Sequence, residues 1–441
     1  MTYKTCLGNT SIHALHPEIL GLIFKMNAGV LNDSDEWNTP GGRIWCDRAL
    51  GNTISTSHIF NAWRTAILRS PSLWGGLIDV DYLMRLDAAG RDEVLRRAGD
   101  ALSSSDSQLF VVSLLFENWK RIKHFHITIG EELFSKADWE PLYWPAKYLQ
   151  FFSLTINTRT WNPNPVVLEG QLFSNDAPQL QVFESNLLLH LDTSATWLAH
   201  LRRLCLRETS RRMIPLGSLL DAVKVMRQLE SLLLTFTAVE APTTDVTPVS
   251  IVEMPSLLHI GISGVQVMRA IDFLDHLIPS RGCGLQAKLT VDPSFKDSVE
   301  AEHFQNTLAR YARNWFEHNT HCHSLYITVS NHVLRIHQES IPRSLLRPLA
   351  IDFRTFQSHP VIVDKYFLLF AILSECDLTN VENLGLSLKI TETSVPLIWY
   401  FFRPAFPNVE LLCTSAQTLE LITPYDPSEA PLFPKLIYGT S

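Results

Sequence analysis

One short pattern of apolar residues returns along most of this chain of 441 residues. The pattern is apolar-x-x-apolar-x-apolar. Its last two apolar residues are two positions apart, which predicts a strand with one face in a core. Clear copies begin at Ile122, Leu149, Leu180, Leu201, Leu229, Leu257, Val381 and Val409. Copies start 28 residues apart at 201, 229 and 257, and again at 381 and 409, with less regular spacing before 201. A unit of this size cannot bury its own apolar face, so the units must stack to form a continuous core.

This phrase and its interval resemble the leucine-rich repeat, in which each unit contributes one strand and a helix or an irregular return. The resemblance implies an α/β chain in which residues 108–441 form a solenoid with parallel strands on its concave side. The asparagine that follows the phrase in that family is present at Asn157. In other copies the same position holds Gly130, Thr209, Thr237, Val265 and Lys389. Without stacked asparagines to bond the backbone at each turn, we expect an irregular solenoid with uneven curvature.

Helical returns are predicted between some of the strands, because apolar residues recur there at helical spacing. The first stripe comprises Leu219, Leu220, Val223 and Met226, the second Ile271, Leu274, Leu277 and Ile278, and the third Phe304, Leu308, Tyr311 and Trp315. Such stripes are typical of core packing and not of a cofactor site. Between Thr290 and Ile351 the strand phrase fades, which predicts an insertion or a long helical return.

Two short amphipathic helices are predicted ahead of the repeats. The first starts near Pro17, which suits the first helical position, and Glu18 lies in its positive first turn. Its apolar stripe comprises Ile19, Leu20, Ile23 and Phe24. Residues 25–50 favour turns and predict an exposed insertion, with a further helix at 45–50 as the alternative.

The second helix is predicted from Ser57 to Leu68, with Ser55, Thr56 or Ser57 as its cap and Ser70–Pro71 after its end. Its stripe comprises Ile59, Phe60, Trp63 and Ile67. Helices of this length bury too little area to offset their ordering entropy alone, so the stripes predict a partner or a docked domain.

These two helices together resemble the F-box, in the form common among basidiomycete fungal proteins. The matching residues are Leu15, Pro17, Glu18, Ile19, Leu20, Ile23 and Phe24 at the front and Trp63, Arg64, Pro71, Leu73 and Trp74 at the back. His16 stands where the family has its first proline, and Ile59–Phe60 stands where it has Val-Cys. The resemblance implies a helical domain at 11–80 and a connection at 81–107 before the repeats.

The F-box resemblance also implies docking on the Skp-type adaptor of a cullin–RING ubiquitin ligase. The expected contacts are apolar and come from Leu15, Pro17, Ile19, Leu20, Ile23, Phe24, Ile59, Phe60, Trp63 and Ile67. The alternative interpretation is that these are two ordinary core helices of a larger domain, because amphipathic periodicity by itself is common.

Composition limits the class of partner. Hydrophobic residues make up 46% of the chain and charged residues 19%, which is enough for two or more domains with sizeable cores. The formal net charge is -8, so no general positive field attracts nucleic acid or an anionic membrane surface. We therefore expect neither as a partner.

The cysteines and the amino end favour an intracellular chain, cytoplasmic or nuclear. The seven cysteines include no Cys-x-x-Cys pair, which is typical of a reduced compartment. Met1–Cys6 is not followed by the apolar segment of a secretion signal, and no apolar run approaches the roughly 20 residues that cross a bilayer.

Few residues point to catalysis or to a metal. His318, His321, Cys322 and His323 have metal-ligating side chains, but they lack a second ligand pair at zinc-finger spacing. Cys205 and Cys413 lie inside strand phrases, where a small buried residue suffices. No nucleotide-binding, metalloprotease or hydrolase motif is present. We expect no metal, no cofactor and no enzymatic activity.

A local basic cluster is the remaining candidate for ligand binding. It comprises Arg202, Arg203, Arg207, Arg211 and Arg212. It suits an acidic or phosphorylated ligand, or else it is a solvated surface partly balanced by Glu208.

The sequence thus predicts a substrate receptor that binds the adaptor through its amino-terminal helices and a target protein, of unknown identity, through the solenoid. The alternative is a repeat scaffold that folds its F-box-like helices onto itself and binds no adaptor.

Overall fold

The structure is a computed structural model. It describes Ile23, residues 51–59 and 61–68, separate positions between 86 and 96, and the ranges 115–130, 136–157, 167–168, 170–186, 188–189, 193–207, 215–236, 250–264, 267–291, 298–330, 333–338, 348–355, 372–374, 376–389, 405–422 and 433–436. The chain forms two compact units. The first comprises Met1–Lys120 with Glu132–Pro141, and the second Arg121–Glu131 with Leu142–Ser441.

The described part of the first unit is helical. Residues 51–57 form a helix, a turn follows at 58–59, and α3 (Asn61–Leu68) comes next. The predicted start of the second helix at Ser57 is therefore wrong. The Ser57 Oγ donates to the carbonyl of Ile54 at 2.6 Å and the Thr56 Oγ1 to that of Asn52 at 2.7 Å. Both hydroxyls bond back into the preceding helix, which competes with capping of the next one.

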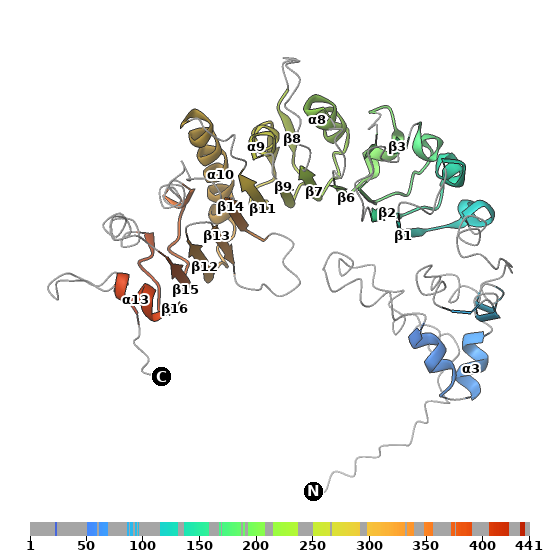
Figure 1. Ribbon diagram of the computed structural model, residues 1–441, viewed down its shortest axis with the longest axis horizontal. Coiled ribbons are helices and arrows are strands. Elements are labelled where there is room, and N and C mark those ends of the chain that lie inside the picture. Colours follow the sequence, from blue (N-terminus) through green and yellow to red (C-terminus); the bar gives the residue numbers. More distant parts are fainter. Residues whose placement is uncertain are drawn as a thin grey trace, which may run out of the picture. The chain divides into compact units, whose positions relative to one another are not determined.

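The second unit is built on a sheet of twelve strands, most of them parallel (Figure 1). In spatial order the strands are β1 (His124–Gly130), β2 (Phe151–Asn157), β4 (Val182–Ser185), β6 (Arg203–Arg207), β7 (Ser231–Phe236), β9 (His259–Gly264), β11 (Gly284–Val291), β14 (Ala350–Thr355), β13 (Val333–Gln338), β12 (Ser324–Val329), β15 (Asn383–Leu388) and β16 (Leu411–Thr414). Two small parallel pairs lie outside it, β8 (Val252–Met254) with β10 (Leu277–Pro279) and β3 (Val167–Leu168) with β5 (Leu188–Leu189). The predicted α/β class is confirmed.

The register of the strands aligns successive copies of the sequence phrase. Its second apolar residues pair directly from strand to strand, in the order Phe125, Phe152, Phe183, Leu204, Leu232 and Ile260. All six side chains are buried. The phenylalanines stack with ring centroids 5.2 Å and 5.1 Å apart. Equivalent residues of neighbouring units therefore build the core by contact with one another.

A repeated backbone turn precedes these strands. The N–H of the first apolar residue donates to the carbonyl three residues earlier, as in Leu149 to Ala146, Leu229 to Met226 and Val381 to Leu378. One residue further on, a single carbonyl accepts two N–H groups from the next unit, as the Gln150 carbonyl does from Gln181 and Val182. The units thus stack through backbone hydrogen bonds at the amino ends of their strands. These bonds use no side-chain atoms, so they do not depend on the residue type at these positions.

Helices cover one side of the sheet. The longer ones are α8 (Leu216–Val225), α9 (Val267–Asp275) and α10 (Ser298–His318), which Figure 1 shows on the same side of the strands. Shorter elements are the 3-10 helices η3 (Trp119–Arg121), η5 (Lys136–Tyr143), η6 (Leu172–Asn175) and η7 (Thr196–His200) and the helix α13 (Ala416–Ile422). The predicted stripes of α8 and α10 are buried throughout.

The second predicted helical stripe is wrong at its end. The helix α9 stops at Asp275, and Leu277 and Ile278 belong to the strand β10, where Ile278 is exposed. Ile278 precedes Pro279, and a residue before proline disfavours the helical conformation.

The parallel order is interrupted once. After β11 the chain passes through α10, a helix of 21 residues, and enters the sheet at β12, three positions further along. It then runs back through β13, which is antiparallel to both of its neighbours, and fills the remaining position with β14, parallel to β11. The long helical return predicted between Thr290 and Ile351 is confirmed.

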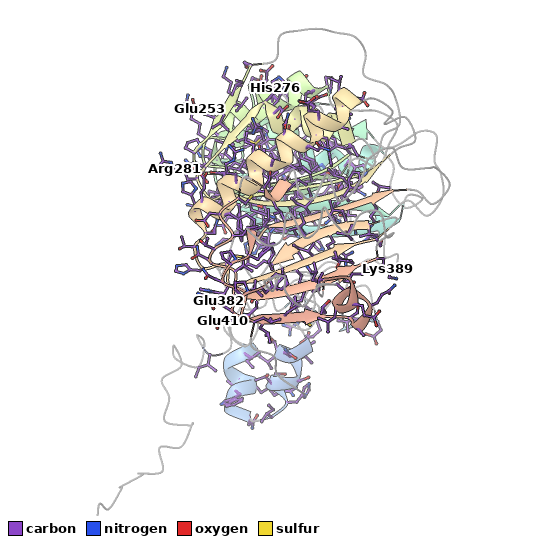
Figure 2. All side chains as sticks on the ribbon, turned by 90° about the vertical axis from the view of Figure 1, so that its left-hand side faces the viewer. Glu253, His276, Arg281, Glu382, Lys389 and Glu410 are labelled. Atoms are coloured by element: carbon purple, nitrogen blue, oxygen red, sulfur yellow. The ribbon has the colours of Figure 1, made fainter. Side chains whose placement is uncertain are left out.

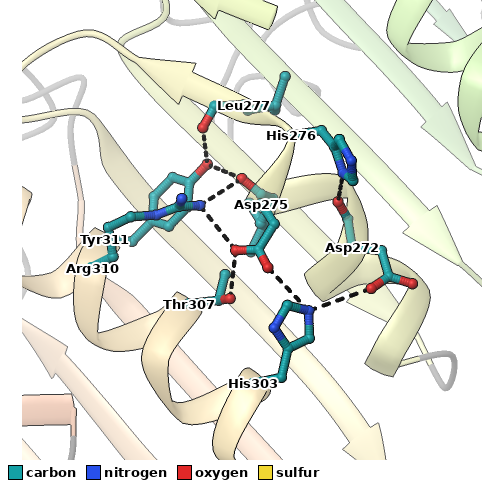
Figure 3. A network of polar contacts seen from close by, with 9 residues as sticks. Asp272, Asp275, His276, Leu277, His303, Thr307, Arg310 and Tyr311 are labelled. Carbon is teal, nitrogen blue, oxygen red and sulfur yellow. Dashed lines mark hydrogen bonds and ion pairs between the residues drawn. The ribbon is translucent and has the colours of Figure 1, made fainter. Parts of the chain in front are cut away.

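A network of polar contacts attaches α10 to α9 (Figure 3). The Asp275 carboxylate accepts hydrogen bonds from the Thr307 hydroxyl at 2.6 Å and from the Arg310 guanidinium at 3.2 Å, and lies 3.0 Å from the Nε2 of His303. The buried Tyr311 hydroxyl donates to the carbonyl of Leu274 at 3.0 Å, and burial raises its pKa. These contacts hold α10 against α9, and α10 is the helix that leads to the inserted strands β12 and β13.

Candidate protein-binding surfaces

Four of the ten residues predicted to contact an adaptor are described. Ile23 is helical and 40% exposed, and Ile59 lies in the turn before α3 and is 68% exposed. Trp63 is partly exposed, whereas Ile67 is fully buried. The other predicted contact residues, Leu15, Pro17, Ile19, Leu20, Phe24 and Phe60, lie outside the described residues. The predicted stripe of the second helix is thus divided, with Ile59 open to solvent and Ile67 in the core of its own chain.

The second candidate surface is the polar face of the large sheet, the face directed away from α8, α9 and α10. In the described strands this face carries more basic than acidic side chains. The basic ones are Arg203, Arg207, Lys288, Arg335 and Arg354, and the acidic ones are Glu184 and Asp352. The whole chain has a formal charge of -8. A positive surplus on this face is therefore a local feature that favours an acidic ligand.

One carboxylate of the polar face belongs to a covered ion pair. Arg203 on β6 lies 3.2 Å from Glu184 on β4, and these side chains are 13% and 15% exposed. Neighbouring side chains respond to the same burial. Burial raises the pKa of the Cys205 thiol, and burial together with the charge of Arg203 lowers the pKa of His259 to about 4. The Glu184–Arg203 pair is neutral as a unit and is poorly accessible to a ligand.

The other carboxylate lies in an open group, which we call the basic cluster: Lys288, Arg335, Asp352 and Arg354. Asp352 accepts hydrogen bonds from Arg335 at 3.0 Å and from two nitrogens of Arg354 at 2.9 and 3.1 Å. The two arginine side chains are 40% and 44% exposed, while Asp352 is 17% exposed. Burial alone would raise the pKa of Asp352, but the hydrogen bonds from Arg354 and Arg335 outweigh it and lower that pKa.

The strand order assembles this cluster. Asp352 on β14 pairs with Lys288 on β11 on one side and with Arg335 on β13 on the other. Lys288 is exposed and forms no ion pair within the part of the chain that the structure describes. Two guanidinium groups therefore bond one carboxylate, and Lys288 adds a third cation at the paired position on β11. Cations thus outnumber carboxylates in this group.

An aromatic side chain lies on the strand next to the basic cluster. Tyr326 on β12 covers Gly385 on β15 so closely that an added Cβ at Gly385 would come within 2.1 Å of the ring. The His337 ring meets Tyr326 edge-on at 5.4 Å. Tyr326 is thus a partly exposed aromatic side chain on the strand next to that of Arg335, and Tyr and Arg are enriched among the residues that contribute most to binding energy at protein interfaces.

Three of the five arginines predicted to form a local cluster at residues 202–212 are described, and their surroundings differ. Arg202 precedes β6 and lies 3.5 Å from the exposed Glu230, while Arg203 belongs to the covered pair with Glu184. Arg207 ends the strand and is exposed, and Arg211 and Arg212 lie outside the described residues. Arg202 and Arg203 are adjacent, so their side chains point in opposite directions, whereas Arg203 and Arg207 share the polar face of β6.

The candidate metal ligands are also separated. The His318 ring bonds the carbonyl of Asn314, and His323 lies 3.5 Å from Glu382. The Cys322 side chain is buried, and this burial raises the pKa of its thiol to about 12. Among the described residues no three metal-ligating side chains come together.

Some charged residues lie at the ends of the strands and not on the face of the sheet. Figure 2 shows Glu382 and Glu410 at the amino ends of β15 and β16 and Lys389 at the carboxyl end of β15. Both glutamates donate their backbone N–H to the carbonyl of the preceding unit, at 3.0 and 2.8 Å. Their carboxylates are thus held beside the stacking turns and away from the basic cluster.

No model of a known protein family and no curated protein matches this chain. Among the helices that the structure describes, none combines the length and the apolar character needed to cross a membrane.

Proposed function

We propose that this chain is a substrate-recognition subunit of an SCF-type (Skp–cullin–F-box) E3 ubiquitin ligase. Its amino-terminal helices bind a Skp-type adaptor, and its repeats, an irregular leucine-rich-repeat solenoid with parallel strands on the concave side, hold a target protein. The chain forms no covalent bond itself, since ubiquitin transfer is carried out by other subunits.

The exposure of Ile23 and Ile59 carries the first half of this proposal. Ile23 matches the F-box pattern and Ile59 keeps an apolar side chain where that pattern has Val, and both residues are open to solvent, at 40% and 68%. Single exposed apolar residues are normal on a protein surface, so the weight comes from the coincidence of exposure with the pattern. Covering both side chains is the contribution expected of an adaptor.

The in-register sheet supports the second half. Among the described residues, the longer helices lie on one side of the parallel strands (Figure 1), and side chains from many units lie together on the opposite face. Such a face binds protein without any catalytic group, because affinity comes from complementary shape and charge.

A repeat scaffold without an adaptor is the second candidate. The burial of Ile67 favours it, because this residue was expected at the adaptor interface and is instead fully covered by its own chain. The two candidates differ in whether Ile23 and Ile59 contact another subunit.

Co-expression with a Skp-type adaptor, followed by pull-down, tests the proposal. We expect Ile23→Asp combined with Ile59→Asp to reduce adaptor recovery by about tenfold or more, because a buried charge at an interface is costly. The matched control is Ile251→Asp, which alters an isoleucine of the second unit that is 62% exposed. This control should recover the adaptor like the wild type. Equal recovery by all three proteins, or none by the wild type, would favour the scaffold.

A further inference from the structure

We infer that the basic cluster and the adjoining Tyr326 form a docking surface for an acidic, extended segment of the target protein. The inference rests on the proposed function, to which it adds the chemistry of the target. It is carried by four charged side chains on β11, β14 and β13 and by one aromatic ring on the next strand, β12.

The first step concerns the order of the two arginine side chains before a ligand binds. Arg354 uses its Nε and one terminal nitrogen on Asp352, and Arg335 uses one terminal nitrogen. Each guanidinium group therefore keeps further N–H donors, and the side chains of Arg335 and Arg354 are 40% and 44% exposed. Asp352 holds the two guanidinium groups in place before any ligand arrives. A fixed guanidinium binds a carboxylate at a lower entropic cost than a mobile one.

The second step concerns charge. The covered pair of Glu184 and Arg203 is balanced one to one, whereas in the basic cluster Lys288, Arg335 and Arg354 face only Asp352. A surplus of two positive charges remains unneutralised by the described residues. An acidic ligand would complete this balance, and the exposed guanidinium groups are accessible to it.

The third step concerns spacing. Lys288 and Arg335 lie on strands separated only by β14, so their backbones are about 10 Å apart. In a polyproline II segment, residues three apart lie on the same side and about 9 Å from each other. A segment with acidic residues at every third position therefore matches the two sides of the cluster. A residue of the segment that lies beyond Arg335 can pack on Tyr326, because Tyr326 is on β12, the next strand after β13.

The acidic segment is favoured over a nucleic acid for an electrostatic reason. Charge is screened over about 8 to 10 Å at physiological salt, so a short segment experiences only the local cluster. A long polyanion also meets the rest of a chain whose net charge is -8. The chemistry that fits is thus a compact row of carboxylates.

Fluorescence anisotropy with the full chain tests the inference. The probe is a labelled peptide of repeated Glu-Pro-Pro triplets, and the control probe replaces each Glu by Gln. We expect Arg335→Gln combined with Arg354→Gln to weaken binding of the acidic probe about tenfold or more, and Lys288→Gln about threefold. Binding should weaken as salt is raised. Arg202→Gln is the matched control, since Arg202 is an exposed arginine outside the cluster and should leave affinity unchanged.

The outcomes separate this inference from the proposed function. Lys288→Gln removes no contact made by a described residue, so its effect on binding does not depend on a change in folding. Equal binding of the acidic and Gln probes, equal binding by all variants, or tighter binding of a thymidine oligonucleotide would overturn the inference. Adaptor pull-down by the same variants should be unchanged. If the wild type binds the acidic probe but not the adaptor, the docking surface stands and the ligase role fails.

Discussion

The Glu184–Arg203 pair and the basic cluster are built from the same chemistry and differ in exposure and charge balance. Each joins arginine to a carboxylate across neighbouring strands of the polar face. The first lies between parallel strands, is balanced and is covered. The second lies at the only antiparallel strand of the described sheet, has a positive surplus and is exposed. The comparison indicates that exposure and charge balance, more than residue type, separate a structural ion pair from a binding surface.

The largest expected effect comes from breaking the covered pair. Arg203→Met leaves the Glu184 carboxylate poorly hydrated and unpaired, so we expect a loss of about 3 kcal/mol in the free energy of unfolding. Urea denaturation measures it. The control, Arg202→Met, breaks the exposed contact with Glu230 and should cost less than about 0.5 kcal/mol. Similar losses in the two variants would show that the covered pair is no different from a surface one.

The second prediction compares histidines beside the two arginine groups. Burial and the charge of Arg203 lower the pKa of His259 to about 4. Between about pH 6.5 and pH 4 the histidine is therefore protonated in the unfolded chain and neutral in the folded chain. Stability should therefore fall as pH drops through this window, by up to roughly 3 kcal/mol. His259→Phe should flatten this part of the profile of unfolding free energy against pH.

His337→Phe is the comparison for that measurement. Burial and Arg335 lower the pKa of His337, but the charge of Asp352 opposes them, so its variant should flatten the profile less. Asp352 itself has a lowered pKa, so its stabilising effect is present above about pH 4 and is lost only at lower pH. An equal or larger effect of His337→Phe would contradict the assignment of the slope to the covered region.

The third prediction concerns the aromatic platform. Gly385→Ala places a methyl group against the Tyr326 ring, which must move, and we expect a cost of about 1 to 2 kcal/mol together with weaker binding of the acidic probe. Thermal melting and anisotropy measure the two effects. Tyr326→Ala in the same chain should relieve the clash and restore part of the stability, while leaving binding weak. Unchanged binding in both variants would remove Tyr326 from the docking surface.

The smallest effect is expected from Lys288→Gln. Lys288 is exposed and has no described ion-pair partner, so the free energy of unfolding should change by less than about 0.5 kcal/mol. The same substitution should weaken the acidic probe. A loss of stability equal to that of Arg203→Met would instead make the basic cluster a structural element.

The repeat was predictable because it is a local pattern. The pairing of Phe152 with Phe183 and of Leu232 with Ile260 follows from their equal positions in the phrase. The strand β11 was missed because its phrase is one residue shorter, Cys283-x-Leu285-x-Ala287, although these three residues are buried. Counting cysteine as apolar would also have completed the phrase of β12, where Cys322 takes the first position.

The basic cluster was not predictable from sequence patterns. Lys288, Arg335 and Arg354 are far apart in the chain, and only the order β11, β14, β13 brings them around Asp352. That order depends on long-range pairing after α10, which no local periodicity encodes. The alternation of Ile351, Asp352, Phe353 and Arg354 did contain a signal, because two charged residues share one face of a strand there.

The reversed strand β13 has a consequence for how chains of this design vary in length. Its neighbours β14 and β12 both run in the common direction, so the inserted block presents ordinary parallel edges to β11 and to β15. Whole units added or deleted on either side would find the same hydrogen-bonding partners as before. We therefore expect that β11 and β15 could pair directly in parallel if the block were deleted, because both strands already present the same hydrogen-bonding pattern to it.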